Sequence, residues 1–220
     1  MANSTLTFIG SDAGFGDNNN SAYIEFENKL IIIDCGITVF NKIKHKFAFE
    51  KYGEVNIIIT HLHNDHAGSL SQLVLYLYYI CSIKATIISA RKNLREYLRL
   101  TGTTDEMYTL LNTNTNIEFI KTEHVPTLDC YGFCMKVNSK KIVYTGDTKI
   151  LEPFMPHLEN ADEFYVDVSK DGGVHLKFED IIPELRNIKN NGTDVYLMHT
   201  DDKAYISEKN NNEFVIVKGE

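Results

Sequence analysis

The sequence is short of basic side chains, has few cysteines and lacks any long apolar segment. It holds 22 Lys and Arg against 30 Asp and Glu, and the net charge of -8 argues against a protein that wraps nucleic acid, because phosphate binding needs clustered cations. None of its four cysteines forms a C-x-x-C pair, which favours buried free thiols in a reducing compartment. The longest apolar stretch, residues 73–83, is too short to cross a bilayer, and the first residues carry no signal-peptide pattern. We therefore expect a cytoplasmic protein with no membrane partner.

What the chain does have is a succession of short apolar runs. With 220 residues, no repeat and no linker, residues 1–220 are expected to form a single domain with a sizeable core. Strand-like runs dominate both halves, so we expect an α/β (α+β) fold in which two mixed β-sheets lie face to face with helices outside. The expected strands cover residues 5–9, 21–26, 29–33, 55–59, 85–89, 117–121, 131–137, 140–145, 164–168, 194–198 and 213–217. The expected helices cover residues 68–82, 93–100 and 178–188, with a weak helix at 105–111.

A glycine-rich segment, residues 10–17, joins the first two expected strands. No Gly-Lys-Ser/Thr follows it, and the next element is a strand rather than a helix, which argues against a phosphate-binding loop. We interpret the segment as a turn-rich loop that lines the site.

The densest chemical signal in the sequence is an H-x-H-x-D-H pattern. It directly follows the expected strand at 55–59, so it lies where the chain leaves a sheet, a common place for functional groups. In an extended stretch, the side chains of His61 and His63 point the same way and can bind one ion. Asp65 and His66, beyond the bend, can face a second ion. Imidazole and carboxylate together suit Zn²⁺, with Mn²⁺ or Fe as alternatives, and the density of the pattern disfavours a polar loop with chance histidines.

Three further residues of ligand type, His124, Asp147 and His199, each follow another expected strand. A single histidine in such a place is usually a hydrogen-bonded structural group. Three of these residues in addition to H-x-H-x-D-H indicate a site with two metals. Asp34, which follows the strand at 29–33, is interpreted either as a capping group or as the hydrogen-bond partner of a metal-bound histidine.

This ordered set, from Asp34 to His199, closely resembles the five sequence motifs of the metallo-β-lactamase superfamily and extends over nearly the whole chain. The resemblance implies an αββα sandwich with two metal ions per subunit. Histidine at position 63, followed by Asp65-His66, favours Zn²⁺ over iron, because the flavo-diiron branch has glutamate at this second position of the motif. Aspartate at position 147, where many β-lactamases have cysteine, favours the phosphodiesterase branch. By this resemblance, the first metal would have the ligands His61, His63 and His124, and the second the ligands Asp65, His66 and His199, with Asp147 bridging.

Asp167 and His175 resemble a pair in the ribonuclease Z-like branch, in which an acidic residue orients a histidine that protonates the leaving oxygen. The sequence departs from that branch in two ways: the acidic residue is one methylene shorter, and Leu176-Lys177 replaces the polar residues after the histidine. The resemblance implies that His175 is the general acid, Asp167 its orienting partner and Asp65 a further catalytic group. The alternative is a surface histidine in a glycine-rich loop.

The long basic arm with which transfer-RNA-processing members clamp RNA has no counterpart here, so we expect no stable nucleic-acid binding. The chain is similar to the anti-Pycsar proteins of bacteriophages. That resemblance implies a homodimer, with contacts at 69–83 and 103–116, that acts in the host cytoplasm as a viral counter-defence. It would hydrolyse 3′,5′-cyclic mononucleotides such as cCMP, cUMP, cAMP or cGMP to 5′-monophosphates by means of a hydroxide that bridges two metals. The alternatives are a ribonuclease Z-like nuclease, a thioesterase or lactamase of the same fold, and a protein that sequesters nucleotides without cleaving them.

Overall fold

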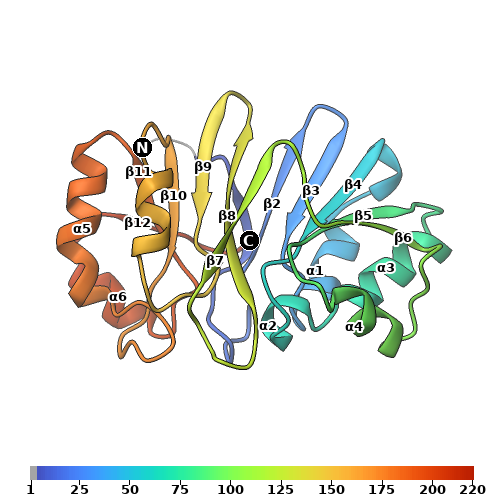
Figure 1. Ribbon diagram of the computed structural model, residues 1–220, viewed down its shortest axis with the longest axis horizontal. Coiled ribbons are helices and arrows are strands. Elements are labelled where there is room, and N and C mark those ends of the chain that lie inside the picture. Colours follow the sequence, from blue (N-terminus) through green and yellow to red (C-terminus); the bar gives the residue numbers. More distant parts are fainter. Residues whose placement is uncertain (1–3) are drawn as a thin grey trace.

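Two six-stranded β-sheets packed face to face form the centre of the protein (Figure 1). The computed structural model describes residues 4–220. The first three residues, which belong to the segment examined for a signal peptide, lie outside this range. The first sheet has the strand order β1-β2-β3-β4-β5-β6; its first two pairs are antiparallel and the rest parallel. Its strands are β1 Thr7–Gly10, β2 Ser21–Phe26, β3 Lys29–Ile33, β4 Glu54–Ile58, β5 Ala85–Ile88 and β6 Tyr108–Leu111.

The second sheet repeats this plan with the later part of the chain. Its order is β12-β11-β10-β9-β8-β7, and β7 to β9 pair antiparallel whereas β9 to β12 pair parallel. Its strands are β7 Ile117–Thr122, β8 Cys130–Val137, β9 Lys140–Tyr144, β10 Glu163–Asp167, β11 Asp194–Met198 and β12 Val215–Ile216.

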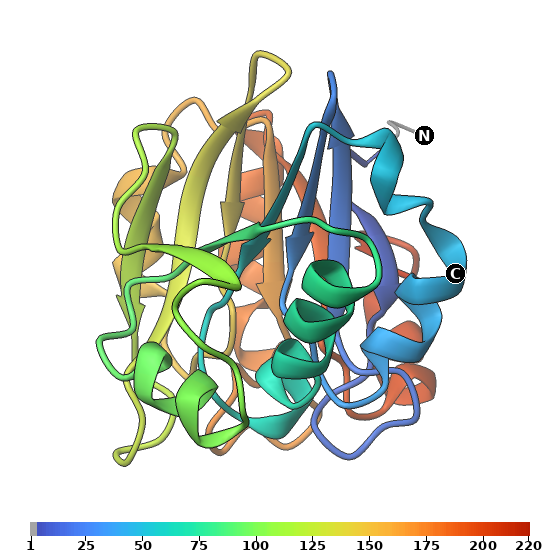
Figure 2. The same ribbon diagram turned by 90° about the vertical axis from the view of Figure 1, so that its right-hand side faces the viewer.

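Helices cover the outer face of each sheet, so the molecule has four layers (Figures 1 and 2). Helices α1, α3 and α4 pack on the first sheet, and α5, α6 and the short helix η2 pack on the second. The helices are α1 Val39–Lys46, η1 Phe49–Lys51, α2 Asn64–Ala67, α3 Leu70–Tyr79, α4 Leu94–Leu100, η2 Glu152–His157, α5 Phe178–Asn190 and α6 Lys203–Asn210.

The strands are apolar on both faces because each face is covered. In β4, Ile57 packs towards the helices while Ile58 packs between the two sheets. In β10, Val166 faces the helices and Tyr165 lies between the sheets, where its ring stacks on that of Tyr196 at 4.8 Å. Burial on both faces explains why the sequence shows continuous apolar runs here instead of a strict alternation. The expected αββα sandwich is therefore confirmed.

The parallel strands of both sheets end at one shared edge of the sandwich. Ligands in open sheets of this kind bind beyond the carboxyl ends of parallel strands. Helix α2, which begins just after the H-x-H pair, lies at this edge between the two sheets (Figure 1). The fold thus brings the segments that follow β4, β9 and β11 to one place.

Three expectations about local structure were wrong. The segment at 105–111 is not a helix: Tyr108–Leu111 forms strand β6, because it pairs with the exposed edge of β5 in parallel register. The final strand is shorter than expected, Val215–Ile216. Helices α1 and α6 were not predicted; α6 does have a local signal, since the Asp202 carboxylate accepts a hydrogen bond from the Tyr205 amide at 2.9 Å and caps the helix.

Within residues 4–220, no helix has the length and apolar character that crossing a membrane requires.

Candidate metal centre

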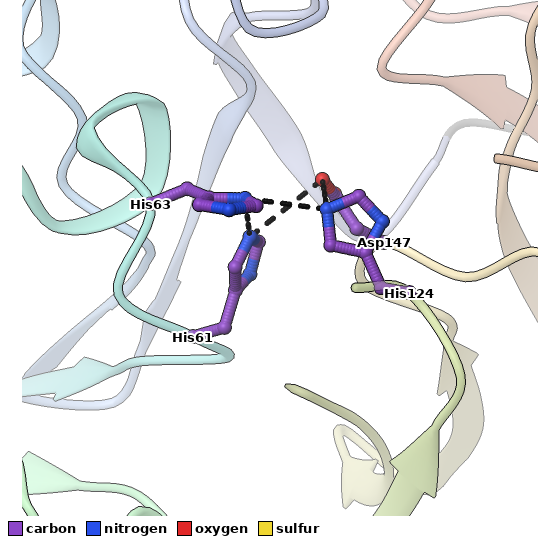
Figure 3. A group of neighbouring side chains, drawn as sticks. All are labelled: His61, His63, His124 and Asp147. Atoms are coloured by element: carbon purple, nitrogen blue, oxygen red, sulfur yellow. Dashed lines mark hydrogen bonds and ion pairs between the residues drawn. The ribbon is translucent and has the colours of Figure 1, made fainter. Parts of the chain in front are cut away.

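Ligand-type side chains from several strand ends form two adjacent clusters at the shared edge, and a third group joins Asp147 and His199 of these clusters to Asp167 and His175. Within each cluster the ligand atoms lie within 4.8 Å of one another. Figure 3 shows the first cluster, in which three imidazole rings and one carboxylate converge. The first cluster consists of His61, His63, His124 and Asp147, and the second of Asp65, His66, Asp147 and His199.

The nitrogen atoms in the first cluster have the spacing of ligands to one ion. His63 Nδ1 lies 3.0 Å from His61 Nε2 and 3.2 Å from His124 Nε2. Two nitrogens bound to one tetrahedral zinc at about 2.0–2.1 Å would lie about 3.3 Å apart. The first cluster therefore fits a metal ion of this size without rearrangement.

Asp147 belongs to both clusters and presents a different oxygen to each. Its Oδ2 lies 3.7 Å from His61 Nε2 and 3.6 Å from His124 Nε2, whereas its Oδ1 lies 3.1 Å from His66 Nε2 and 3.6 Å from His199 Nε2. The buried Oδ1 has no hydrogen-bond donor. A buried carboxylate oxygen without a donor is costly unless a cation faces it, so Asp147 fits the position of a bridging ligand.

Hydrogen bonds at the far side of the rings fix which nitrogen faces the clusters. His124 Nδ1 donates to the Val174 carbonyl at 2.8 Å, and His199 Nδ1 donates to Asp167 Oδ1 at 3.2 Å. In the neutral ring, a proton on Nδ1 leaves Nε2 with its lone pair. Both Nε2 atoms therefore face the clusters as potential metal ligands.

Asp34 fixes the orientation and the protonated nitrogen of the His66 ring in the same way. Its Oδ2 accepts from His66 Nδ1 at 2.8 Å and from Thr60 Oγ1 at 2.8 Å, while its Oδ1 accepts from the Thr60 amide at 2.9 Å. Thr60 Oγ1 in turn lies 3.1 Å from His61 Nδ1 and accepts its proton. Of the two roles considered for Asp34, the structure has the hydrogen bond to a ligand-type histidine. The contribution of Thr60 was not predicted, because its spacing gives no signal.

The charges of the second cluster attract a cation. Burial opposes ionisation of Asp147, but His199, His66 and His61 hold the pKa of its carboxyl well below its usual range. Burial likewise opposes the charged form of His199, but Asp147, Asp167 and Asp65 raise its pKa to about 10. The negative charge of these carboxylates is thus balanced by positive charge, either as protons on the histidines or as metal ions.

Left-handed backbone turns the chain sharply at three strand ends beside the clusters. Asp34 after β3 has φ 58°, Gly146 before Asp147 has φ 57°, and His199 after β11 has φ 53°. Such values are uncommon for residues other than glycine and persist where the surroundings impose them. At Asp34 and His199 the turn places the side chain at the edge of the sheet.

Asp167 connects the second cluster to His175. Its Oδ2 accepts from His175 Nδ1 at 2.8 Å and from the Thr148 amide at 3.1 Å, while its Oδ1 accepts from His199. The sequence predicted that Asp167 and His175 act together, and the structure brings them into contact. It also shows that Asp167 holds His199, which the sequence did not indicate.

The loop between β1 and β2 lies directly against the second cluster. A side chain at Gly14 would place its Cβ 3.4 Å from Asp65 Oδ2, and the Ala13 amide donates to the Thr200 carbonyl at 3.2 Å, next to His199. The loop at 10–17 thus lines the site, as expected. All the predicted site residues therefore lie in one region, in the two clusters or in the adjoining pair of Asp167 and His175.

Fold and site together define a metal-dependent hydrolase of phosphodiester bonds with the metallo-β-lactamase fold, as predicted. The chain belongs to the family described as anti-Pycsar protein Apyc1, whose family model matches residues 4–99 and 89–220. The anti-Pycsar protein Apyc1 of Bacillus phage 010DV004 is 25% identical over 231 residues, covering 90% of this chain and 89% of that protein.

Solved structures share the fold at low sequence identity. The metallo-β-lactamase fold protein YhfI from Bacillus subtilis superposes with a TM-score of 0.79 at 20% identity, covering 97% of this chain and 96% of its own. Human tRNase Z, short form, superposes with a TM-score of 0.69 at 14% identity, covering 98% of this chain and 96% of its own. The expected resemblance to this fold and this family is confirmed.

Proposed function

We propose that this protein is a two-zinc phosphodiesterase that hydrolyses 3′,5′-cyclic mononucleotides to 5′-monophosphates. The observation that carries the proposal is the position of Asp147, which presents one oxygen to each cluster. Membership of the Apyc1 family supports the cyclic-nucleotide substrate, and the small, acidic chain argues against nucleic acid as the main partner.

The donor set assigns each residue a role towards the metals. When bound, the two Zn²⁺ ions lower the pKa of water to near neutrality and offset the charge of the phosphate. Mn²⁺, which prefers carboxylate ligands, is the alternative metal. The residues that would hold the first ion are His61, His63 and His124, and those that would hold the second are Asp65, His66 and His199, with Asp147 shared.

His175 is placed to protonate the leaving oxygen. Its ring centroid lies 4.9 Å from that of His124 and 5.0 Å from that of His199, so it adjoins both clusters. Burial opposes its charged form, but Asp167 raises the pKa of His175 above its ordinary value, which suits a proton donor near neutral pH. As a hydroxide derived from water, whose proton has gone to solvent, bonds to phosphorus and the bond from phosphorus to O3′ breaks, His175 Nε2 would give its proton to O3′. Asp167 would keep the other ring nitrogen fixed.

Location and assembly are part of the same proposal. The protein would act in the cytoplasm, that of the infected host cell if it is viral, as a homodimer with contacts from residues 69–83 and 103–116. Sedimentation of the purified protein tests the dimer. A monomer at micromolar concentration would contradict it.

The substrate class is tested by incubating the zinc-loaded protein with cyclic mononucleotides, cyclic dinucleotides, a precursor transfer RNA, a β-lactam and a thioester. We expect 5′-monophosphates from the cyclic mononucleotides. Hydrolysis of the β-lactam and thioester alone would overturn the phosphodiesterase proposal, and cleavage of transfer RNA alone would favour a nuclease. Tight binding of a cyclic nucleotide without turnover would indicate sequestration.

The general acid is tested with His175→Ala. We expect kcat to fall by about 10²–10⁴ with unchanged zinc content, because His175 is a ligand of neither proposed metal. His157→Ala is the matched control, since His157 is a partly buried histidine in η2 that pairs with Glu118, away from the clusters. Full activity of the His175 variant would refute the assignment.

A further inference from the structure

Phe15 is the most exposed large apolar side chain in residues 4–220. Its relative exposure is 109%, so the ring has no protein partner. It lies in the loop between β1 and β2, which both views place at the lower edge of the sandwich beside α2 (Figures 1 and 2). Phe15 directly follows Gly14, the residue that lies against Asp65 of the second cluster.

The loop that carries Phe15 is fixed to the segments that bear the second cluster. The Ala13 amide donates to Thr200, which follows His199, and the Gly16 amide closes a turn onto the Ala13 carbonyl at 2.8 Å. Asp12 accepts from the Asn18 amide at 2.9 Å and forms an ion pair with Lys203 of α6. These contacts fix the backbone on both sides of Phe15, so its side chain starts from a set point one residue beyond the contact of Gly14 with Asp65.

The glycine before Phe15 makes this approach possible. A Cβ at position 14 would already be in van der Waals contact with the Asp65 carboxylate, so a larger side chain would push the loop away from the cluster. The residue that follows this close approach is the fully exposed Phe15. An aromatic face beside a phosphate-binding centre is what a nucleobase stacks on.

We propose that Phe15 is the base-stacking residue of the site and that it holds the nucleobase while the metal clusters hold the phosphodiester. This inference rests on the proposed function, because it requires a nucleotide substrate. It adds that the protein recognises the base through a π-face presented by its own loop.

The kinetic test compares two substrates in Phe15→Ala. The substrates are 3′,5′-cyclic AMP and the base-free 1-O-methyl ribose 3′,5′-cyclic phosphate. Stacking that is equal in the ground and transition states affects KM alone, so KM for cyclic AMP should rise about 10-fold with kcat retained, and the base-free substrate should be unaffected. Phe15→Tyr should restore KM. Met155→Ala, which removes another exposed apolar side chain in η2, is the control and should change neither substrate.

A binding test needs no turnover. The chain has no tryptophan, so Phe15→Trp introduces a single indole at the proposed stacking position. Its fluorescence should be quenched by 5′-AMP and not by ribose 5-phosphate, while Met155→Trp should respond to neither. Because Phe15 makes no packing contacts, these variants should fold as the unmodified protein does.

An equal rise in KM for both substrates, or no quenching by 5′-AMP, would overturn the inference. Dissociation of a dimer by Phe15→Ala with unchanged KM would also overturn it, because the ring would then contact a second copy. Failure of the unmodified protein to hydrolyse any phosphodiester would refute the proposed function instead, and base-dependent quenching in Phe15→Trp would still establish the stacking site.

Discussion

Replacing Asp34 by asparagine should weaken metal binding without removing a metal ligand. Asp34 is fully buried, and its Oδ2 accepts the Nδ1 proton of His66 at 2.8 Å. Asparagine can place its oxygen on the Thr60 amide, as Oδ1 does now, and this leaves its NH₂ group facing His66. The ring must then accept at Nδ1 and carry its proton on Nε2, the atom that faces Asp147 at 3.1 Å. A protonated Nε2 cannot bind a metal.

The size of the effect follows from this change of tautomer. Loss of a partner that orients a histidine ligand costs about 10–100-fold in metal affinity, or about 1.4–2.7 kcal/mol. Competition with a chromophoric zinc chelator measures the affinity, and ¹⁵N chemical shifts of the imidazole report which nitrogen carries the proton. We expect the larger loss at the second cluster, because Asp34 contacts His66 directly and reaches His61 of the first cluster only through Thr60 Oγ1.

Ser21→Ala provides the matched control. Ser21 is also fully buried and its hydroxyl donates to the backbone carbonyl of Asp34 at 2.9 Å, so the variant disturbs the same residue without touching its carboxylate. It should lower the free energy of unfolding by about 1 kcal/mol and leave zinc affinity unchanged. If Asp34→Asn binds zinc as tightly as the unmodified protein, or if His66 keeps its proton on Nδ1, the reasoning is refuted.

Three further outcomes are expected. Asp167→Asn should lower both zinc affinity and kcat, because Asp167 holds His199 as well as His175, whereas His175→Ala lowers kcat alone; equal zinc titrations for the two variants would contradict this. Removing the metals with a chelator should lower the thermal unfolding midpoint, and zinc at 100 times its Kd should restore about 2.7 kcal/mol per site, measured by calorimetry. Gly132→Ala should lower the free energy of unfolding, measured by urea titration, by about 1–3 kcal/mol, because the alanine Cβ would lie 2.4 Å from the backbone oxygens of Tyr144 and Thr145. An unchanged urea midpoint would show that β8 can move to relieve this contact.

Most strands of this protein could be predicted from the sequence because they are buried on both faces. The runs at 21–26, 29–33 and 194–198 have the observed bounds, since an apolar segment of strand length ended by polar residues leaves few alternatives. The edge strand β6 could not be predicted in this way. Its partly exposed Tyr-Thr-Leu-Leu segment becomes a strand through pairing with β5, and that pairing joins residues 23 positions apart.

The site likewise has features that the sequence predicts and features that depend on tertiary structure. The types and order of the ligand residues could be read from the sequence, because dense histidine and aspartate at strand ends have few other uses. Only the tertiary structure decided that Asp147 presents one oxygen to each cluster, that Asp167 accepts from two histidines, and that Gly14, next to the exposed Phe15, lies against Asp65. These relations depend on distances between segments far apart in the chain, and such distances are set by how the two sheets pack.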